Sequence, residues 1–320
     1  MKNKRAASFI SAVEARFPGL VGAVRTMIEA SERQFGARSG SGAGESYLWE
    51  HTTHVASLAF ELARSEKTDP LIPALVALFH DAGKFAGGTY HQGKKAEEEE
   101  AAAMAGRVLG QFGAGAAQAR RVASGLRALY NSRAKRNRAA DIVHDADFLS
   151  KFGTMGIAQF FIKSTLRGRT LEQAISNQLS KELTYAACLP SNMRTRAGKR
   201  QAEKKSTATL QFFRALLREL REAHVGDFVV RRIRVKPSGR PGSFIEVRLA
   251  VPRSCTKCGG PWKIAFKTEP GTKCEKLEAE ITCLRCGEKA RVSFCLPEVS
   301  PPPRRGLRTD SAPPGPNFPD

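Results

Sequence analysis

The stretch Ala74-Leu-Val-Ala-Leu-Phe-His-Asp-Ala-Gly-Lys84 decides the fold of this chain. Its first half is apolar on every side, which predicts a helix buried at the centre of a helical bundle. His80 and Asp81 follow at the end of that helix, and Gly83 ends it. An imidazole beside a carboxylate suits one hard or borderline cation, so this stretch predicts a metal site in the bundle core.

Two further runs supply candidate ligands to the same site. His51 lies in Glu50-His-Thr-Thr-His-Val55, and Asp147 lies in Asp145-Ala-Asp-Phe-Leu149. Both runs are helical in character, so three helices would each direct ligands into the core. A set of imidazoles and carboxylates that leaves positions open favours Mn, Fe, Co, Ni or Mg over a closed structural zinc site.

This ordered set resembles the HD-domain superfamily of metal-dependent phosphohydrolases, over roughly residues 45–165. The matching residues are His51, the pair His80-Asp81 with Ala-Gly-Lys84 after it, and Asp147 in Ala-Asp-Phe-Leu. The resemblance implies that the histidines and aspartates of this set hold one divalent ion. Such an ion would polarise a phosphoryl oxygen and lower the pKa of its bound water.

The same resemblance implies roles for residues around the ligands. Asp81 is expected to act in catalysis as well as in metal binding, and Lys84 to face the substrate and neutralise phosphate charge. His91 lies in a polar loop and is either a general acid for the leaving oxygen or an ordinary loop residue. His54 and Asp145 are candidate substrate contacts. His54 stands where the family often has arginine, and Asp145 is the alternative ligand in its run.

The sequence departs from those family members that bind two metal ions. Such members carry additional histidines after the His-Asp pair, at places that here hold Glu97–Glu100 and Tyr130-Asn131. We therefore expect one metal ion, unless Glu97 or a neighbouring glutamate recruits a second. A single-metal site resembles the nucleotidase branch of the superfamily more than the cyclic-dinucleotide phosphodiesterase branch.

Four cysteines near the carboxyl terminus form a second candidate metal site. Cys255-Thr-Lys-Cys258 and Cys283-Leu-Arg-Cys286 resemble the two knuckles of a zinc ribbon, and glycine follows each pair. These four thiolates are predicted to bind one structural zinc ion at about 2.3 Å. The chain has 7 cysteines. An odd count with two close pairs favours metal ligation in a reducing compartment over disulfides.

The net charge of +21 and the pI of about 10.1 are high for a soluble enzyme. Such a charge attracts polyanions, so a nucleotide, RNA or DNA is the expected partner, although a basic surface without a partner is the alternative. The ribbon is also a candidate site for a protein partner. The candidate nucleic-acid contacts are Arg133, Lys135, Arg136, Arg138, Arg231, Arg232 and Arg234.

The sequence predicts an α+β chain. We expect an all-α HD-type bundle over 1–180, a basic helical connector over 181–226, a β-hairpin with a zinc ribbon over 227–298, and a disordered Pro-rich tail over 299–320. An apolar run of about 18 residues is missing, so no membrane partner is expected. Without a signal-peptide pattern, the cytoplasm is the default location.

The predicted function is hydrolysis of a phosphate ester in a nucleotide or a nucleic acid. The basic ribbon would recruit the substrate. The alternative is a nucleic-acid-binding or scaffold protein whose HD domain is catalytically weak or inactive.

Overall fold

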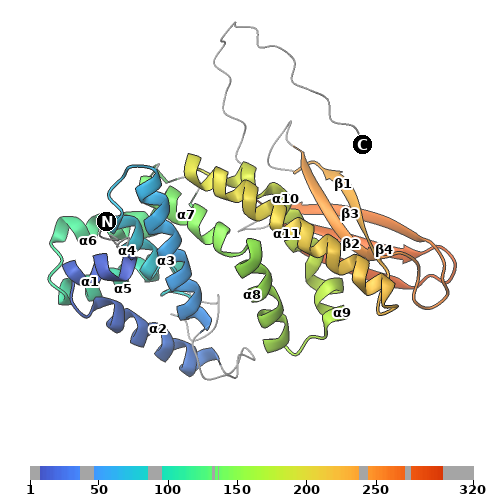
Figure 1. The fold of residues 1–320 in the computed structure, drawn as a ribbon, viewed down its shortest axis with the longest axis horizontal. Coiled ribbons are helices and arrows are strands. Elements are labelled where there is room, and N and C mark those ends of the chain that lie inside the picture. Colours follow the sequence, from blue (N-terminus) through green and yellow to red (C-terminus); the bar gives the residue numbers. More distant parts are fainter. Residues whose placement is uncertain are drawn as a thin grey trace, which may run out of the picture.

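The structure is a computed structural model, and it describes residues 8–36, 47–85, 96–131, 134–135, 137–237, 244–270 and 275–297. Helices α1 to α7 form one end of the molecule, helices α8 to α11 its middle, and the strands its other end (Figure 1). This arrangement confirms the predicted α+β class, in which a helical bundle precedes small antiparallel sheets.

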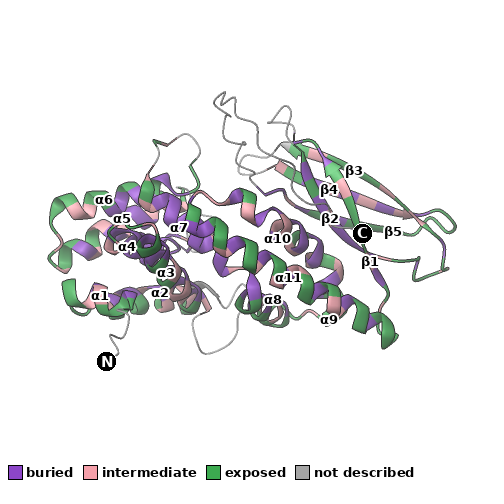
Figure 2. Ribbon diagram, turned by 45° about the horizontal axis from the view of Figure 1, so that its top comes forward, coloured by how far each residue is buried: buried purple, intermediate pink, exposed green. Residues whose placement is uncertain are grey.

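The bundle is built around α4. Every residue of this helix from Ile72 to Phe79 is buried, as the apolar run predicted, and α4 and α7 are largely buried in Figure 2. Helices α3, α6 and α7 pack directly against α4. The bundle helices are α1 (Phe9–Arg16), α2 (Leu20–Gly36), α3 (Tyr47–Ser65), α4 (Leu71–Phe79), α5 (Glu97–Gln111), α6 (Ala116–Ala128) and α7 (Arg138–Ser150).

The middle of the molecule is a packed helical layer. It consists of α8 (Gly153–Leu166), α9 (Leu171–Ala174), a π-helical turn (Ile175–Leu179), α10 (Ser180–Asn192) and α11 (Arg196–Glu222). Phe213 of α11 and Leu179 share a core with Phe228 and Ala250 of the first sheet. The segment predicted as a connector is therefore an integral layer that contacts both the bundle and the sheets.

Two antiparallel sheets form the carboxyl-terminal part. Strands β1 (Phe228–Val235) and β2 (Ile245–Pro252) form a hairpin, and β3 (Trp262–Pro270), β4 (Glu275–Cys283) and β5 (Lys289–Cys295) form a meander. Alternate residues of β2 and β4 are buried in one core between the sheets, as period-two patterning requires.

Helix α10 covers the outer edge of β2. The Ser180 hydroxyl accepts a hydrogen bond from the Ala250 N–H at 2.9 Å, and the Thr184 hydroxyl accepts one from the Arg248 N–H at 3.0 Å. These side chains satisfy backbone donors that an edge strand would otherwise expose. The hairpin is thereby joined to the helical layer by hydrogen bonds as well as by apolar packing.

One cysteine departs from the expectation that metal binding would replace disulfides. Cys295, the last residue of β5, is disulfide-bonded. The other described cysteines, Cys188 and the four ribbon cysteines, are free thiols.

No helix within the described ranges combines the length and the apolar character needed to cross a bilayer.

Gly83 allows the turn after the His-Asp pair to touch the first turn of α5. A Cβ atom at this position would lie 2.1 Å from the carbonyl oxygen of Glu97. Replacing Gly83 by alanine should therefore lower the free energy of unfolding by about 1–3 kcal/mol, through overpacking. Urea denaturation measures this change.

Gly106→Ala is the matched control for this prediction. Gly106 lies inside α5, and a Cβ atom there would meet nothing within 4 Å. The change should leave the free energy of unfolding unaltered or raise it by up to about 1 kcal/mol, because alanine favours the helix. An equal loss of stability in both variants would show that the close approach at Gly83 is not the cause.

Candidate functional site

The predicted metal ligands meet in the core of the bundle. His51 comes from α3, His80 and Asp81 from the end of α4, and Asp147 from α7, and all four are buried. One ligand atom from each of His51, His80 and Asp81 lies within 4.8 Å of the others. Asp147 joins this group through its Oδ1 atom, which lies 3.1 Å from His51 Nε2.

The hydrogen bonding of His80 shows which of its two ring nitrogens can bind a metal ion. His80 Nδ1 lies 2.6 Å from the carbonyl oxygen of Ala77, and a carbonyl only accepts, so Nδ1 carries the proton. In the neutral ring, Nε2 then offers a lone pair. That atom is buried, has no hydrogen-bond partner among the described residues, and lies 3.3 Å from Asp81 Oδ1.

A buried lone pair facing a carboxylate oxygen is unfavourable unless a cation lies between the two acceptors. The donor set therefore fits a metal ion bound by His80 Nε2 and the carboxylate of Asp81. The Nδ1–H bond to Ala77 would hold the ring in the orientation that such a bond requires.

The electrostatics of the site favour deprotonated ligands. Burial raises the pKa of the Asp81 carboxyl, but the neighbouring His80 ring and the ammonium charge of Lys84 outweigh this effect and hold the pKa below its ordinary value. Burial likewise raises the pKa of Asp147, and Lys151 and His51 more than reverse it. For His51, burial is the main influence and it lowers the pKa. Ionised carboxylates and a neutral imidazole are the forms that bind a metal ion.

Two ammonium groups stand beside the ligand carboxylates. Lys84 Nζ lies 2.6 Å from Asp81 Oδ2, which brings this predicted residue to the site. Lys151 Nζ lies 2.7 Å from Asp147 Oδ2, and sequence reasoning missed it. Its spacing, four residues after Asp147 in a helix, was the signal that could have found it.

Tyr130 is a second residue that sequence reasoning did not assign to the site. Its hydroxyl donates a hydrogen bond to Asp147 Oδ2. Its backbone has a φ of 62°, a left-handed conformation that is strained for a bulky side chain. From the sequence, Tyr130 was noted only as a position where two-metal members of the superfamily are expected to carry histidine. In this structure its hydroxyl contacts the candidate ligand Asp147 instead.

Asp145 has a different role from the predicted substrate contact. It is fully buried, and its carboxylate accepts hydrogen bonds from the Arg194 and Thr195 N–H groups at 2.9 and 2.8 Å and from the Thr195 hydroxyl at 2.7 Å. These bonds occupy its lone pairs within the fold. Asp145 thus anchors the start of α11. Because its carboxylate is already bonded within the fold, it is poorly placed to contact a substrate.

His54 lies one helical turn after His51 on α3 and is half-buried. Burial is the main cause that lowers its pKa, and the nearby charge of Lys205 adds to the effect. A neutral imidazole beside the metal centre remains a candidate substrate contact. His91, the candidate general acid, lies outside the described residues.

The candidate nucleic-acid contacts fall into three groups. Arg231, Arg232 and Arg234 are exposed on β1, and Lys135 is exposed before α7. Arg138 forms an ion pair with Glu66, whose other carboxylate oxygen accepts a hydrogen bond from the Ala197 N–H at 2.6 Å. That guanidinium therefore takes part in joining α3, α7 and α11. Arg133 and Arg136 lie outside the described residues.

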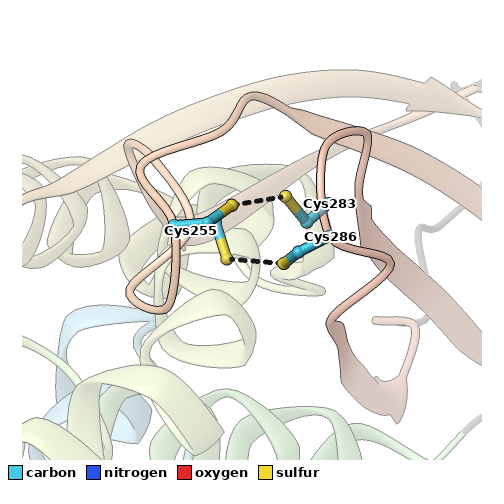
Figure 3. A group of neighbouring side chains, drawn as sticks. Cys255, Cys283 and Cys286 are labelled. Atoms are coloured by element: carbon cyan, nitrogen blue, oxygen red, sulfur yellow. Dashed lines mark hydrogen bonds between the residues drawn. The ribbon is translucent and has the colours of Figure 1, made fainter.

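The four ribbon cysteines converge as predicted. Cys255 Sγ lies 3.6 Å from Cys286 Sγ, and Cys258 Sγ lies 3.5 Å from Cys283 Sγ, as the dashed lines in Figure 3 mark. All four sulfur atoms lie within 4.8 Å of one another. Tetrahedral zinc with bonds of about 2.3 Å requires sulfur atoms about 3.8 Å apart, so the cluster fits this ion.

The two knuckles have matching backbone geometry. Gly259 N–H bonds to the Cys255 carbonyl at 2.8 Å, and Gly287 N–H bonds to the Cys283 carbonyl at 3.1 Å. Both glycines have positive φ values, 69° and 75°, which favour residues without a Cβ atom. The repeated turn holds each cysteine pair in the same way, as expected for a closed four-thiolate site.

The family model of the HD domain matches residues 48–150. Among solved structures, an HD superfamily hydrolase from an uncultured Thermotogales bacterium has a TM-score of 0.47 and 20% identity, covering 66% of this chain and 98% of that chain. YpgQ from Bacillus subtilis in complex with ADP has a TM-score of 0.45 and 23% identity, covering 62% and 94%. An HD-superfamily hydrolase from Bacillus thuringiensis has a TM-score of 0.44 and 18% identity, covering 63% and 98%. A comparison with curated proteins finds no match.

The matched segment contains the whole candidate metal centre. His51 on α3, His80 and Asp81 directly after α4, and Asp147 on α7 all lie within it. Residues 48–150 of this chain therefore match the HD domain family.

Proposed function

We propose that the HD domain is a metal-dependent phosphohydrolase that acts on a phosphate ester of a nucleotide or nucleic acid. The observation that carries this proposal is the buried His80 Nε2 lone pair, which faces the Asp81 carboxylate 3.3 Å away with no donor between them. A divalent cation resolves this conflict. His51, His80, Asp81 and Asp147 would hold it.

A bound divalent ion would supply Lewis-acid polarisation of a phosphoryl oxygen and a more acidic water. The residues of the chain provide the remaining requirements. Asp81 and Asp147 contribute the negative charge that retains a cation, and the Nδ1–H bond of His80 fixes its ring. Lys84, 2.6 Å from Asp81, lies where an ammonium group can neutralise phosphate charge.

Replacement of Asp81 by asparagine tests the enzyme directly. The change keeps the shape of the side chain but removes the ligand charge, so hydrolysis should fall at least about 100-fold. The measurement is turnover of nucleoside phosphates, cyclic nucleotides and single-stranded RNA or DNA with Mn, Co, Ni or Mg. Asp69→Asn, at the exposed start of the same helix, is the matched control and should keep full activity.

The outcome also separates the hydrolase from the alternative function. Turnover by the wild type that is lost in Asp81→Asn supports the enzyme. If the wild-type protein binds metal at this centre but turns over no substrate, the nucleic-acid-binding or scaffold function would be favoured. Equal turnover in the wild type and Asp81→Asn would contradict the assigned site.

We further propose that the ribbon cysteines hold one structural zinc ion. Replacement of Cys258 by serine should reduce bound zinc from about one ion per chain to near zero, because three thiolates bind it far more weakly. Elemental analysis by mass spectrometry measures the metal. Cys188→Ala, which removes a free thiol outside the cluster, should leave the zinc content unchanged. Retained zinc in Cys258→Ser would rule out this ligand set.

The exposed arginines of β1 support recruitment of a nucleic acid. Arg231, Arg232 and Arg234 have no carboxylate within 4.0 Å among the described residues. Arg232 lies directly opposite Arg248 across the hairpin, and Arg248 forms an ion pair with Glu246 at 3.0 Å. Arg231 lies with Pro261 and Trp262 near the cysteine knuckles, whereas Arg232 and Arg234 lie on the other face of β1.

Changing Arg231, Arg232 and Arg234 together to alanine should weaken binding of single-stranded nucleic acid. The slope of log affinity against log salt should fall by about 2, since each lost phosphate contact removes about 0.7. Fluorescence anisotropy over a range of salt concentrations measures this slope.

The matched control removes three positive charges that are already compensated. Lys267, Lys276 and Lys289 lie on the other sheet, and each forms an ion pair with a glutamate. Their joint replacement by alanine alters the net charge equally but should leave the salt slope nearly unchanged. An equal loss in both triple variants would indicate a response to net charge alone.

A further inference from the structure

Lys163 of α8 is a half-buried cation that the metal centre itself does not use. Its ammonium group lies 5.0 Å from the ring centroid of Tyr47, the first residue of α3. Tyr47 precedes the ligand His51 by one helical turn, so the Lys163 side chain reaches the same end of α3 as the metal centre. No carboxylate of a described residue lies within 4.0 Å of this ammonium.

The electrostatic surroundings of Lys163 are those of the metal centre. Burial lowers the pKa of Lys163 to about 8, and the charges of Lys151 and Lys84 contribute to the decrease. Glu182 of α10 and Asp147 oppose it without forming an ion pair with Lys163. A half-buried ammonium without a close counterion is unfavourable, and an anion placed beside it would relieve that cost.

The three lysines have different positions relative to the ligands. Lys84 touches Asp81 and Lys151 touches Asp147, so both lie within reach of a phosphate held at the centre. Lys163 touches neither ligand. Because the charges of Asp147, Lys151 and Lys84 still act on Lys163, an anion beside it would lie next to the reacting phosphate.

The local charge agrees with a substrate whose phosphates carry about two negative charges in all. Lys84, Lys151 and Lys163 balance the carboxylates of Asp81, Asp147 and Glu182, so a divalent ion leaves an excess of about two positive charges. One phosphodiester carries a single negative charge and would neutralise only part of this excess.

We propose that Lys163 binds a second phosphate of the substrate, adjacent to the phosphate that is hydrolysed. This inference rests on the proposed phosphohydrolase function, because the centre must hold the first phosphate. The second phosphate belongs either to the diphosphate of a nucleotide or to the next linkage of a nucleic-acid strand. The chemistry that Lys163 recognises is the same in both.

The test compares the binding of pyrophosphate and orthophosphate to the full chain loaded with Mn²⁺, by titration calorimetry. In Lys163→Met the dissociation constant for pyrophosphate should rise about tenfold, as expected for one lost charged contact, while that for orthophosphate changes less than about twofold. Lys163→Arg should retain binding because it keeps the charge. Lys163→Gln provides a second neutral variant.

Lys181→Met is the matched control. Lys181 is also a lysine over a tyrosine ring, 5.6 Å from the centroid of Tyr185, but it is exposed on α10. Its replacement should alter neither dissociation constant. This control separates the loss of a lysine–tyrosine contact from the loss of the proposed phosphate contact.

Two results would overturn the proposal. One is unchanged pyrophosphate binding in both neutral variants at position 163, and the other is an equal loss for pyrophosphate and orthophosphate. A nucleoside diphosphate and a 5′-phosphorylated dinucleotide, titrated in parallel, distinguish the two sources, since the true one loses more affinity in Lys163→Met. Absence of turnover alongside Lys163-dependent pyrophosphate binding would contradict the hydrolase function alone.

Discussion

The burial of α4 from Ile72 to Phe79 is the constraint on which the rest of the molecule depends. This helix ends in His80 and Asp81, so an imidazole lone pair and a carboxylate enter the core together. Polar groups in that position need compensation. The structure supplies part of it through Lys84 at Asp81 and Lys151 at Asp147, and the remaining acceptor, His80 Nε2, calls for a cation. The packing of α4 thus places the candidate metal ligands His80 and Asp81 in the core.

The sequence predicted the bundle and its ligands because both follow from local patterns. The apolar run of α4 could be satisfied only at the centre of a bundle, and the ligands then had to come from its neighbours. Asp145, two residues before Asp147, was predicted as the alternative ligand in its run and as a candidate substrate contact. Residues two apart on a helix point about 200° away from each other, so the side that faces the centre carries Asp147 and the other side faces α11. Helical geometry alone could have separated the two.

Other features depend on contacts between distant segments and left no local signal. The Tyr130 hydroxyl, just after α6, contacts Asp147 of α7. Lys163 of α8 contacts the ring of Tyr47, more than one hundred residues earlier in the chain. The segment 181–226 was expected to be a connector because it is rich in charge. Its helices instead bury one face each, and hydroxyl groups of α10 bond to the edge of β2. The charged residues lie on the opposite faces, where composition alone could not distinguish a linker from a packed layer.

The same helical layer relates the two candidate metal sites. Lys205 of α11 donates a hydrogen bond to the carbonyl of Phe152, which precedes α8, and acts electrostatically on His54. Helix α10 in turn holds the hairpin that adjoins the cysteine knuckles. The two donor sets differ in softness and in coordination. Four thiolates at tetrahedral spacing select zinc and leave no position for a substrate, whereas imidazoles and carboxylates favour a harder ion with positions open. One chain can therefore hold a closed structural metal and an open reactive one without exchange between them, because each ligand set is poorly suited to the other's coordination.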